Sequence, residues 1–584
     1  MCGISAVFAY RPEAPPVDRD EVAAITQRMF PRGPDAGGTW FSENGRVGLG
    51  SRRLAIIDLS PDGIQPMTDT SGNFVIVFNG EIYNHRDLRK RLERNGATFR
   101  THSDTEVLLE MFKHDGPSMV DLLRGMYAFA IWDKRAERMF VARDPYGIKP
   151  LYIADDGRTV RIASQVKALL AGGKISRAAD PAGVAGFFVT GSVPEPFTTY
   201  AAIHAVEAGN CFFIDRDGPA NAFCHYSIAN IYRRAHLQQE PVATLVEPAT
   251  LLREFVTESL AYHLFADVPV GAFLSAGIDS TTLVALMTAE RHEPPRTITL
   301  SFEEFRGREQ DEAPLASRFA AEIGAPHTSR IVTREEFLAD MPRFFDQMDQ
   351  PTIDGTNTWF VSKAAAEQGL KVAISGLGGD ELFGSYPSFR ELPRIVRLAR
   401  VPLATRILRN PKAKSIARYG QNLAGAYLVK RGLFMPEELH SVLPEDVARE
   451  GLQRLDIAQR IRNVIDVDPG TDFGRIATLE SALYMRNQLL RDTDWASMAH
   501  SLEVRTPLVD AFLLRQLAPL LIVGGSKTKD YFAASARPPL PDYLRNRRKT
   551  GFSVPLKEWL DLPPDGTTTR MRSWARHVFE RVGR

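Results

Sequence analysis

The chain has 584 residues, more than one hydrophobic core usually supports, so two or more domains are expected. Its hydrophobic fraction of 44% and charged fraction of 24% are ordinary for a soluble globular protein and exclude a disordered one. A formal net charge of +1 gives no overall field that would attract nucleic acid or an anionic membrane.

The cysteines and the N-terminal segment indicate a cytoplasmic protein. Cys2, Cys211 and Cys224 are too few and too scattered for a disulfide framework or a zinc site. No apolar stretch approaches the roughly 20 residues that span a bilayer. No basic segment precedes the first apolar residues, so a signal peptide is not expected. We therefore predict neither a membrane nor a nucleic-acid partner.

Cys2 allows two interpretations. It follows Met1 directly, and removal of Met1 would give it a free α-amine with a pKa near ~8, which can act as the base for its own thiol. Alternatively, Cys2 is a small apolar residue at the start of a core strand.

The next segments predict a mixed α and β domain. Residues 48–58 are expected to form a strand with arginines at its start. Residues 73–84 are expected to form a strand that breaks at an Asn79-Gly80 turn, with a helix from about Arg86. Asp104 is placed at a helix start. Residues 125–133 predict a strand covered on both faces, because no polar residue alternates with the apolar ones.

Six short motifs occur here in one order: Cys2-Gly-Ile, Arg32-Gly-Pro-Asp35, Arg53-Leu54, Asn79-Gly-Glu81, Ser103-Asp-Thr-Glu106 and Arg143-Asp-Pro-Tyr-Gly147. They resemble the class II glutamine amidotransferase domain of the N-terminal nucleophile hydrolases. The resemblance implies an αββα sandwich over residues 1–215. Pro31 departs from the family pattern, which usually has His there.

The resemblance also implies roles. Cys2 would attack the glutamine side-chain amide, and Asn79 with the Gly80 N–H would form the oxyanion hole. Arg53 would pair with the glutamine α-carboxylate and Asp104 with its α-ammonium group. The remaining residues of the implied glutamine site are Leu54, Ile56 and Glu81.

A looser, more polar stretch over residues 216–246 is expected to be a linker, and a second domain is expected over residues 247–584. Its central feature is residues 268–287, an apolar run, a small-residue turn and a helical pattern. The N–H groups at a helix start favour an anion. Gly277 permits close approach, the Ser275 and Ser280 hydroxyls can donate, and Asp279 is explained by Mg²⁺ bound to a phosphate.

This turn lacks the Gly-Lys-Ser/Thr of a Walker loop. It resembles the pyrophosphate loop of ATP pyrophosphatases, although a Gly/Ser turn in any α/β protein is the alternative. A further strand at 296–302 and a strand-to-loop transition within residues 371–384 alternate with helices, which indicates a doubly wound parallel sheet with its ligand at the carboxyl ends of the strands. Beyond Ser388 the pattern is mostly helical.

Five more motifs extend the resemblance to the glutamine-dependent asparagine synthetases: Asp349-Gln-Pro-Thr352, Ser375-Gly-Leu-Gly-Gly-Asp-Glu381, Leu490-Arg-Asp-Thr-Asp494, Ser497 to Pro507 and Arg548-Lys-Thr-Gly-Phe552. In that family aspartate and ATP give β-aspartyl-AMP and pyrophosphate. Ammonia released from glutamine then crosses an internal tunnel and displaces AMP. Small-molecule substrates and a homodimer are what the resemblance implies for partners.

By position, the resemblance assigns three groups of residues. The adenylate would contact Leu274, Leu300, Ser375 and Gly376. Pyrophosphate would contact Ser275, Gly277 and Ser280. Mg²⁺ would bind Asp279 and Asp380, and Lys549 would neutralise charge on the transferred phosphate.

Leu377 departs from the asparagine synthetases, which carry Glu there. Leu cannot accept a proton, so either Glu381 or water takes that task, or the acceptor is another carboxylate in a peptide, sugar or natural product. A glutaminase with a degenerate second domain and a non-catalytic glutamine and nucleotide binder are two further alternatives. The intact Ser275–Ser280 motif and Lys549 argue against the glutaminase, and the presence of Cys2, the oxyanion donors and the metal carboxylates argues against the non-catalytic binder.

Overall fold

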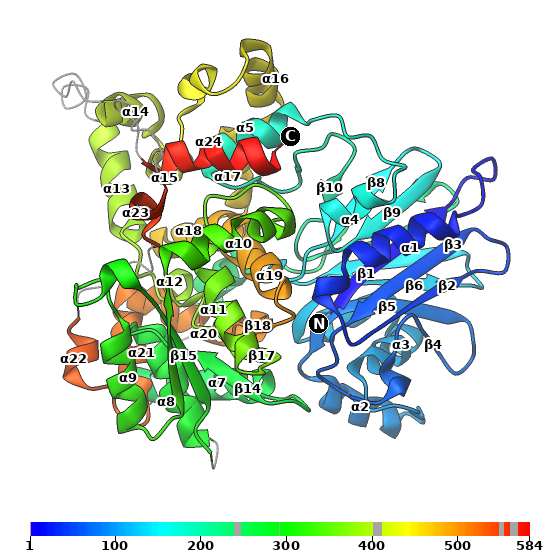
Figure 1. Ribbon diagram of the computed structural model, residues 1–584, viewed down its shortest axis with the longest axis horizontal. Coiled ribbons are helices and arrows are strands. Elements are labelled where there is room, and N and C mark those ends of the chain that lie inside the picture. The colour runs from blue at the N-terminus through cyan, green and yellow to red at the C-terminus, as the bar shows by residue number, and fades with distance from the viewer. Residues whose placement is uncertain are drawn as a thin grey trace.

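The computed structural model describes residues 2–238, 247–290, 293–400, 411–547, 554–560 and 570–583. Two bodies pack side by side (Figure 1). The N-terminal part of the chain forms an antiparallel sandwich, and the rest forms a parallel sheet with a large helical addition. The predicted fold class is confirmed. Among the described residues, no helix combines the length and the apolar character needed to cross a membrane.

The sandwich consists of two antiparallel sheets. The first has the order β10 (His204–Ala205), β8 (Tyr152–Asp155), β9 (Thr159–Ala163), β1 (Cys2–Ala9), β3 (Val47–Arg53), β2 (Ala36–Phe41). The second has the order β12 (Gly218–Pro219), β11 (Asn210–Asp215), β7 (Arg138–Arg143), β6 (Gly125–Asp133), β5 (Phe74–Ile82), β4 (Met67–Thr68), with β13 (Phe223–Cys224) also paired to β11.

Helices cover both outer faces, which gives four layers. Helices α1 (Arg19–Arg28) and α4 (Val166–Ala171) pack on the first sheet, and α2 (His85–Arg94) and α3 (Asp104–Asp115) cover the second. Apolar side chains of β1, β5 and β6 meet between the sheets. Strands buried on both faces are apolar throughout, as the 125–133 pattern predicted.

Two local predictions in this domain are wrong. Strand β3 ends at Arg53, so the arginines close the strand and residues 54–58 leave the sheet. Strand β5 continues through Asn79 and Gly80 to Ile82, because β6 pairs with it along its whole length. Gly80 has φ +152°, and a Cβ there would lie 2.0 Å from the Met126 carbonyl oxygen, so only glycine fits.

The second body is built on a five-stranded parallel sheet. Its order is β16 (His327–Val332), β15 (Arg296–Phe302), β14 (Val270–Phe273), β17 (Val372–Ile374), β18 (Glu503–Arg505). One face is covered by α7 (Pro248–His263), α8 (Ile278–Glu290), α9 (Ala313–Glu322), α20 (Ala511–Gly524) and α21 (Thr528–Ser535). The other is covered by α10 (Arg334–Gln347), α11 (Thr356–Glu367) and α19 (Arg491–Met498).

The helical addition follows Ser388, as predicted. It comprises α13 (Ser388–Ala399), α14 (Pro411–Tyr419), α15 (Leu423–Arg431), α16 (Glu445–Leu455), α17 (Ile457–Val464), α18 (Asp472–Leu479), a π-helix (Glu480–Leu490), and near the C-terminus α23 (Leu556–Trp559) and α24 (Arg570–Val582). The short helices α12 (Gly379–Leu382) and α22 (Asp542–Arg545) lie beside the parallel sheet.

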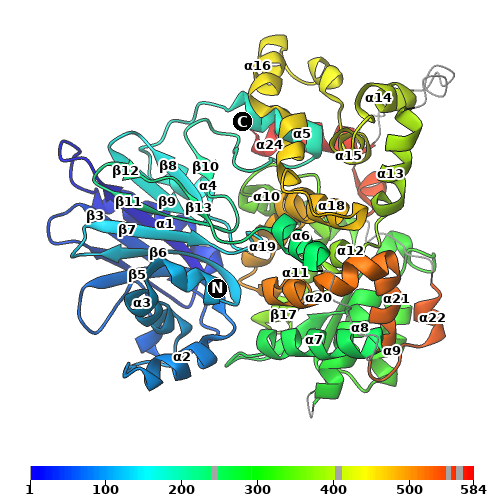
Figure 2. The ribbon, with the colours of Figure 1, turned by 180° about the vertical axis from the view of Figure 1, so that it is seen from behind.

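The two bodies share an extensive boundary. Helix α5 (Pro181–Thr190) leaves the sandwich and packs against α16 (Figure 2). Strands β12 and β13 extend the second antiparallel sheet beyond the expected boundary at residue 215, and α6 (Ile228–Gln238) packs on α20. The segment expected to be a linker is therefore partly structured in both bodies.

Candidate active sites in the two domains

Cys2 is the first residue of β1 and lies beside Asn79 of β5. Its main-chain N–H donates to Asn79 Oδ1 at 3.1 Å. Burial raises the pKa of the Cys2 thiol, while the charge of Arg53 and a hydrogen bond from the Leu54 N–H act in the opposite direction. The resting thiol is therefore neutral and needs a base to become a nucleophile.

The side chain of Asn79 is held by Ser164, which belongs to none of the recognised motifs. The Asn79 Nδ2 donates to Ser164 Oγ at 3.4 Å, and the same Ser164 oxygen accepts the Ile4 N–H at 3.1 Å. Ser164 thus ties β1 and Asn79 together from the end of β9.

Arg53 and Asp104, expected at the two ends of bound glutamine, are both buried and already bonded. The Arg53 guanidinium donates to the carbonyl oxygens of Ile57 and Ser60, each at 3.1 Å, and to that of Asp58. Asp104 accepts the Ile82 N–H at 3.0 Å. Burial raises the pKa of Asp104 and so favours its neutral form, while the charge of His85 and the hydrogen bond from Ile82 act in the opposite direction.

An ion pair between Arg32 and Asp494 connects the start of β1 to the other body. Arg32 Nη1 lies 2.6 Å from Asp494 Oδ2, with 2% and 3% of the two side chains exposed. Arg32 Nε also donates to the Cys2 carbonyl at 3.2 Å, and Lys149 Nζ donates to Asp494 at 3.3 Å. Asp494 follows Thr493, which lines the cavity described below.

A second contact between the bodies starts at Glu81. Arg505 Nη2 lies 3.8 Å from Glu81 Oε2, and Arg505 Nε lies 2.5 Å from Glu503 Oε1. The Arg505 carbonyl accepts the Ser375 N–H at 2.8 Å. Leu54 and Ile56, the remaining expected glutamine contacts, pack in the same apolar cluster as α7 and β14.

The loop between β14 and α8 has the geometry of an anion site. Ser275 Oγ and Ser280 Oγ are 2.8 Å apart, and the Gly277 N–H donates to Ser275 Oγ at 3.1 Å. The loop after β17 approaches it closely, since a Cβ at Gly376 would lie 2.9 Å from the Ser280 nitrogen and one at Gly379 would lie 2.5 Å from Asp279. Glycine at 376 and 379 therefore lets the two loops meet.

These loops form one wall of a cavity of about 550 Å³ at the carboxyl ends of the strands, here called the strand-end cavity. All of the expected nucleotide and metal residues line it: Leu274, Ser275, Gly277, Asp279, Ser280, Leu300, Ser375, Gly376 and Asp380. Lys549 lies outside the described residues.

Two basic residues of the strand-end cavity were not predicted as site residues. Lys529 Nζ donates to Asp279 Oδ1 and lies 3.5 Å from Asp380 Oδ1. Arg547 Nη1 donates to Glu312 Oε1 at 2.8 Å. Lys529 stands in no recognised motif, and Arg547 directly precedes the Arg548-Lys-Thr-Gly-Phe552 motif, of which only Lys549 was expected at the phosphate.

Two carboxyl groups with raised pKa values, those of Glu381 and Asp492, also line the strand-end cavity. Burial and the neighbouring Asp380 raise the pKa of Glu381 to about 8, and Tyr386 Oη donates to Glu381 at 2.9 Å. Burial and Asp354 raise the pKa of Asp492 to about 8. Leu377 also lines the cavity, and its side chain offers no polar atom.

Asp349 has a structural position. Its carboxylate accepts the N–H groups of Val166 at 2.9 Å and Lys167 at 3.0 Å, and so caps α4 from the opposite body. Asp354, in contrast, lines the strand-end cavity.

Sequence comparisons agree with this geometry. The family described as "Glutamine amidotransferase domain" matches residues 1–225, and the family described as "Asparagine synthase" matches residues 251–579. A Bacillus subtilis protein named "Asparagine synthetase [glutamine-hydrolyzing] 1" is 32% identical over 595 residues, covering 99% of this chain and 90% of that protein.

Two further relatives show the range of names. A Mycobacterium tuberculosis H37Rv protein named "Putative asparagine synthetase [glutamine-hydrolyzing]" is 33% identical over 593 residues, covering 96% of this chain and 88% of that protein. A Gibberella zeae protein named "Amidase chry2" is 30% identical over 428 residues, covering 67% of this chain and 60% of that protein.

A glutamine amidotransferase domain joined to a nucleotide-binding parallel sheet defines an ATP-dependent, glutamine-using ligase. Two relatives named asparagine synthetase share 32% and 33% sequence identity with this chain over 90% and 88% of their own length. This similarity narrows the class of ligase to one family. The chain belongs to the glutamine-hydrolysing asparagine synthetase family.

Proposed function

We propose that this protein makes asparagine from aspartate, with glutamine as nitrogen donor and ATP as energy source. The observation that supports this most strongly is the joint presence of a buried Cys2 site and a serine-lined strand-end cavity, connected by the Arg32–Asp494 pair. The homodimer implied by the family stays a prediction.

In the amidotransferase site, Cys2 acts as the nucleophile once Met1 is removed. Its nitrogen, which now pairs with Asn79, becomes an α-amine and takes the thiol proton. The thiolate adds to the glutamine amide carbon, and the Asn79 amide and Gly80 N–H stabilise the oxyanion. Ammonia leaves, and water hydrolyses the thioester to glutamate.

Arg53 keeps donors for the glutamine carboxylate. A guanidinium group carries five N–H groups, and those of Arg53 make three hydrogen bonds to carbonyl oxygens of residues 57–60. The remaining N–H groups can bind the carboxylate. The same loop contacts the second domain, because the Asp58 N–H donates to Asp267 Oδ2 at 2.8 Å.

In the strand-end cavity, an aspartate β-carboxylate oxygen attacks the α-phosphorus of ATP and pyrophosphate leaves. Ammonia then attacks the acyl carbon, the bond to AMP breaks and the nitrogen loses a proton. The Ser275 and Ser280 hydroxyls with the Gly277 N–H hold the pyrophosphate, as expected for a helix N-terminus. Leu274 and Leu300 supply buried apolar surface for the adenine ring.

Asp279 and Asp380 fit a magnesium–nucleotide complex. Such ions are typically held by one or two carboxylates together with substrate phosphates. In this structure the Lys529 ammonium group lies at both carboxylates, which shows that the pair favours a cation. Among the described residues, no group of three or more His, Cys, Asp or Glu side chains is arranged to hold a metal by itself. When bound, Mg²⁺ would neutralise phosphate charge.

We infer that Lys529 neutralises the phosphate in transfer, a role first expected of Lys549. Its side chain is 12% exposed, and burial acts against its charge, but Asp279 and Asp380 raise its pKa. The two carboxylates thus keep the Lys529 ammonium group charged beside the Ser275–Ser280 loop.

Glu381 takes the proton-handling task that Leu377 cannot. Its carboxyl lines the cavity, is nearly buried and has a pKa of about 8. An acid with this pKa is ionised in part near neutral pH and can accept the proton that the attacking nitrogen loses. The Tyr386 hydroxyl fixes its orientation.

A second candidate function is amidation of a carboxylate other than free aspartate. Leu377 favours it, since an apolar side chain replaces the family's acid at the acceptor side of the cavity. Replacement of Leu377 by Glu separates the two candidates. It should raise kcat/KM for aspartate if aspartate is a poor substrate of the wild type, and lower it if Glu381 already serves.

The direct test measures pyrophosphate and asparagine with ATP, Mg²⁺, glutamine and aspartate present. Stoichiometric asparagine, AMP and pyrophosphate support asparagine synthesis. Glutamine hydrolysis without aspartate-dependent pyrophosphate release contradicts it.

A further inference from the structure

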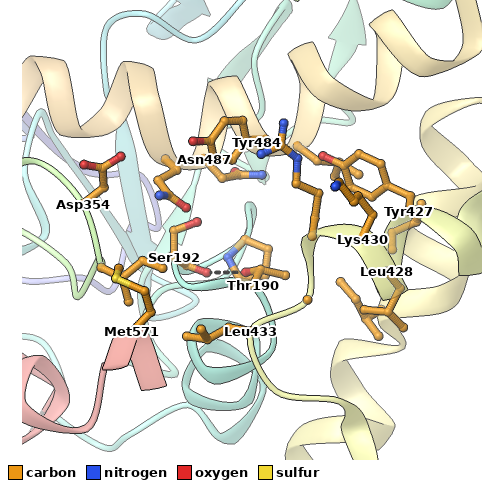
Figure 3. Close-up of a pocket in the computed structure, with 18 of the residues that line it drawn as sticks. Thr190, Ser192, Asp354, Tyr427, Leu428, Lys430, Leu433, Tyr484, Asn487 and Met571 are labelled. Atoms are coloured by element: carbon orange, nitrogen blue, oxygen red, sulfur yellow. Dashed lines mark hydrogen bonds between the residues drawn. The ribbon is translucent and has the colours of Figure 1, made fainter. Parts of the chain in front are cut away.

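A second cavity of about 450 Å³ lies next to the strand-end cavity (Figure 3). It is bounded by the end of α5, by α15 and α17, and by the π-helix Glu480–Leu490. We call it the helical cavity. Asp354 lines both cavities, so they meet at that residue. Figure 3 places Asp354 at one end and Tyr427 and Leu428 at the other.

Two aromatic rings also stand at the junction. Tyr386 lines the strand-end cavity, Tyr484 lines the helical cavity, and their ring centroids are 6.0 Å apart. The Arg431 guanidinium lies 3.8 Å from the Tyr484 ring centroid and 4.7 Å from that of Tyr386. The Glu381–Tyr386 pair therefore lies at the boundary with the helical cavity.

The helical cavity is mostly apolar. Its described apolar lining includes Leu428, Leu433, Ile457, Ile461, Leu483 and Met571. A volume of this size falls within the range of about 300–1,000 Å³ that accommodates small-molecule ligands, and apolar lining with few polar groups is typical of such sites. Free aspartate has no apolar body that would use this space.

The two cations in the described lining already have acidic partners. Arg431 Nη2 lies 2.8 Å from Glu480, which is completely buried, and Lys430 Nζ lies 2.6 Å from Glu391. A ligand that carries a second carboxylate or a phosphate would have to compete with these pairs. The helical cavity therefore favours an uncharged body.

One polar group of the wall lacks a partner. Thr356 lines the helical cavity two residues beyond Asp354 and is 3% exposed. Its Oγ1 makes no hydrogen bond to the described residues, but the oxygen itself is buried within the wall and is not presented to the cavity.

We propose that the helical cavity is an acceptor subsite for aspartyl compounds whose α-carboxyl group carries an uncharged apolar extension. The β-carboxylate enters the strand-end cavity, the α-amide lies near Asp354, and the apolar part occupies the space along Leu428 and Leu483. This inference rests on the proposed ligase function and widens its acceptor class. The reaction is unchanged: the β-carboxylate oxygen displaces pyrophosphate from ATP, and ammonia then displaces AMP.

The test compares three acceptors in the full-length protein with ATP, Mg²⁺ and glutamine. L-aspartate lacks an extension, L-aspartyl-L-phenylalanine amide carries an apolar uncharged one, and L-aspartyl-L-glutamate carries a charged one. We expect the phenylalanine amide to reach a kcat/KM at least tenfold that of the glutamate dipeptide. Equal values for the two dipeptides, or no turnover of either beside turnover of aspartate, would overturn the subsite and leave the ligase function standing.

Two variants test whether the preference for the apolar acceptor depends on the helical cavity. Leu483→Trp fills it, and we expect the kcat/KM ratio of the phenylalanine amide to aspartate to fall at least tenfold. Leu452→Trp is the matched control, because Leu452 is a half-buried residue of α16 that lines neither cavity. An equal fall in both variants, or none in Leu483→Trp, overturns the proposal.

Folding and the ligase function are checked in the same samples. Glutamine hydrolysis at Cys2 reports a folded protein, and if Leu483→Trp lacks it, Leu428→Ala provides the second variant. Leu428→Ala enlarges the cavity, and we expect it to change the same kcat/KM ratio while Leu452→Ala does not; an unchanged ratio in Leu428→Ala overturns the subsite. Absence of pyrophosphate release with every acid, beside normal glutamine hydrolysis, instead overturns the ligase function itself.

Discussion

Arg32 and Asp494 form an ion pair with a 2.6 Å contact that is almost completely buried between the two domains. Arg32 also donates to the carbonyl of Cys2, and Asp494 adjoins Thr493 of the strand-end cavity. One side chain from each domain thus connects the main chain of Cys2 to the residues beside the strand-end cavity. We propose that this ion pair couples the two reactions.

Asp494→Asn tests this coupling. Removal of one partner leaves Arg32 and Lys149 buried without their anion, and such losses typically cost about 3–5 kcal/mol. We expect a lower free energy of unfolding and more glutamate formed per amide product. Synthesis with added ammonia should fall less than synthesis with glutamine. Equal losses with both nitrogen donors would contradict a coupling role.

The loss of stability in Asp494→Asn should depend on pH in one direction. Burial acts against the Asp494 charge, but Arg32 and Lys149 lower its pKa below the usual 3.8. A carboxyl group whose pKa is lower in the folded state than in the unfolded state stabilises the fold at pH values above its unfolded-state pKa. This stabilisation is lost as the pH falls through the folded-state pKa. The difference in Tm between wild type and Asp494→Asn should therefore be full at pH 6 and shrink below pH about 4. A constant difference would contradict this assignment.

Cys2→Ala should abolish glutamine hydrolysis and leave ammonia-dependent pyrophosphate release intact. The thiol is the only nucleophile assigned to the amidotransferase site, whereas the strand-end cavity lies in the other domain. Cys224→Ala is the control, because that cysteine is exposed on β13. Retained hydrolysis in Cys2→Ala would exclude Cys2 as the nucleophile.

Lys529→Met should reduce pyrophosphate release by 10²-fold or more, the effect of about 2.7 kcal/mol of lost charge stabilisation. Glutamine hydrolysis should continue. Lys527→Met removes an exposed lysine two residues away and should change neither rate by more than twofold. A variant Lys529→Met with normal pyrophosphate release would return the phosphate role to Lys549.

Glu381→Gln tests the proton-handling group. Because burial raises the pKa of Glu381 to about 8, its base form increases as pH rises from 6 to 9. The amide formed per glutamine hydrolysed should rise over that range in the wild type and stay low and flat in Glu381→Gln. An unchanged profile in the variant would assign the proton to water.

Much of the fold was predictable from the sequence because its signals are local. The apolar run 125–133 and the β-branched run 296–302 correspond to β6 and β15. The interruption predicted at Asn79-Gly80 failed because pairing with β6 overrides the turn preference of those residues. Pairing with a distant strand cannot be predicted from the nine residues of β5 alone.

Contacts between residues distant in sequence also limit what could be predicted about the candidate sites. Residues inside motifs, such as Ser275 and Gly376, fall on one cavity wall, as strand order predicts. Lys529 belongs to no recognised motif, and only the packing of α21 against α8 brings it to Asp279. The contact between Arg32 and Asp494 spans 462 positions and could not be read from spacing. The helical cavity likewise depends on four separate helices meeting.

We propose that glutamine hydrolysis at Cys2 supplies ammonia for an ATP-dependent amidation in the second domain. One assay can follow glutamate, pyrophosphate and asparagine formed from [amide-¹⁵N]glutamine, ATP, Mg²⁺ and aspartate. We expect ¹⁵N in the asparagine side chain, in equal amount to pyrophosphate, and none with Cys2→Ala. Glutamate formation with no ¹⁵N in any amide product, from aspartate or its peptide derivatives, would contradict it.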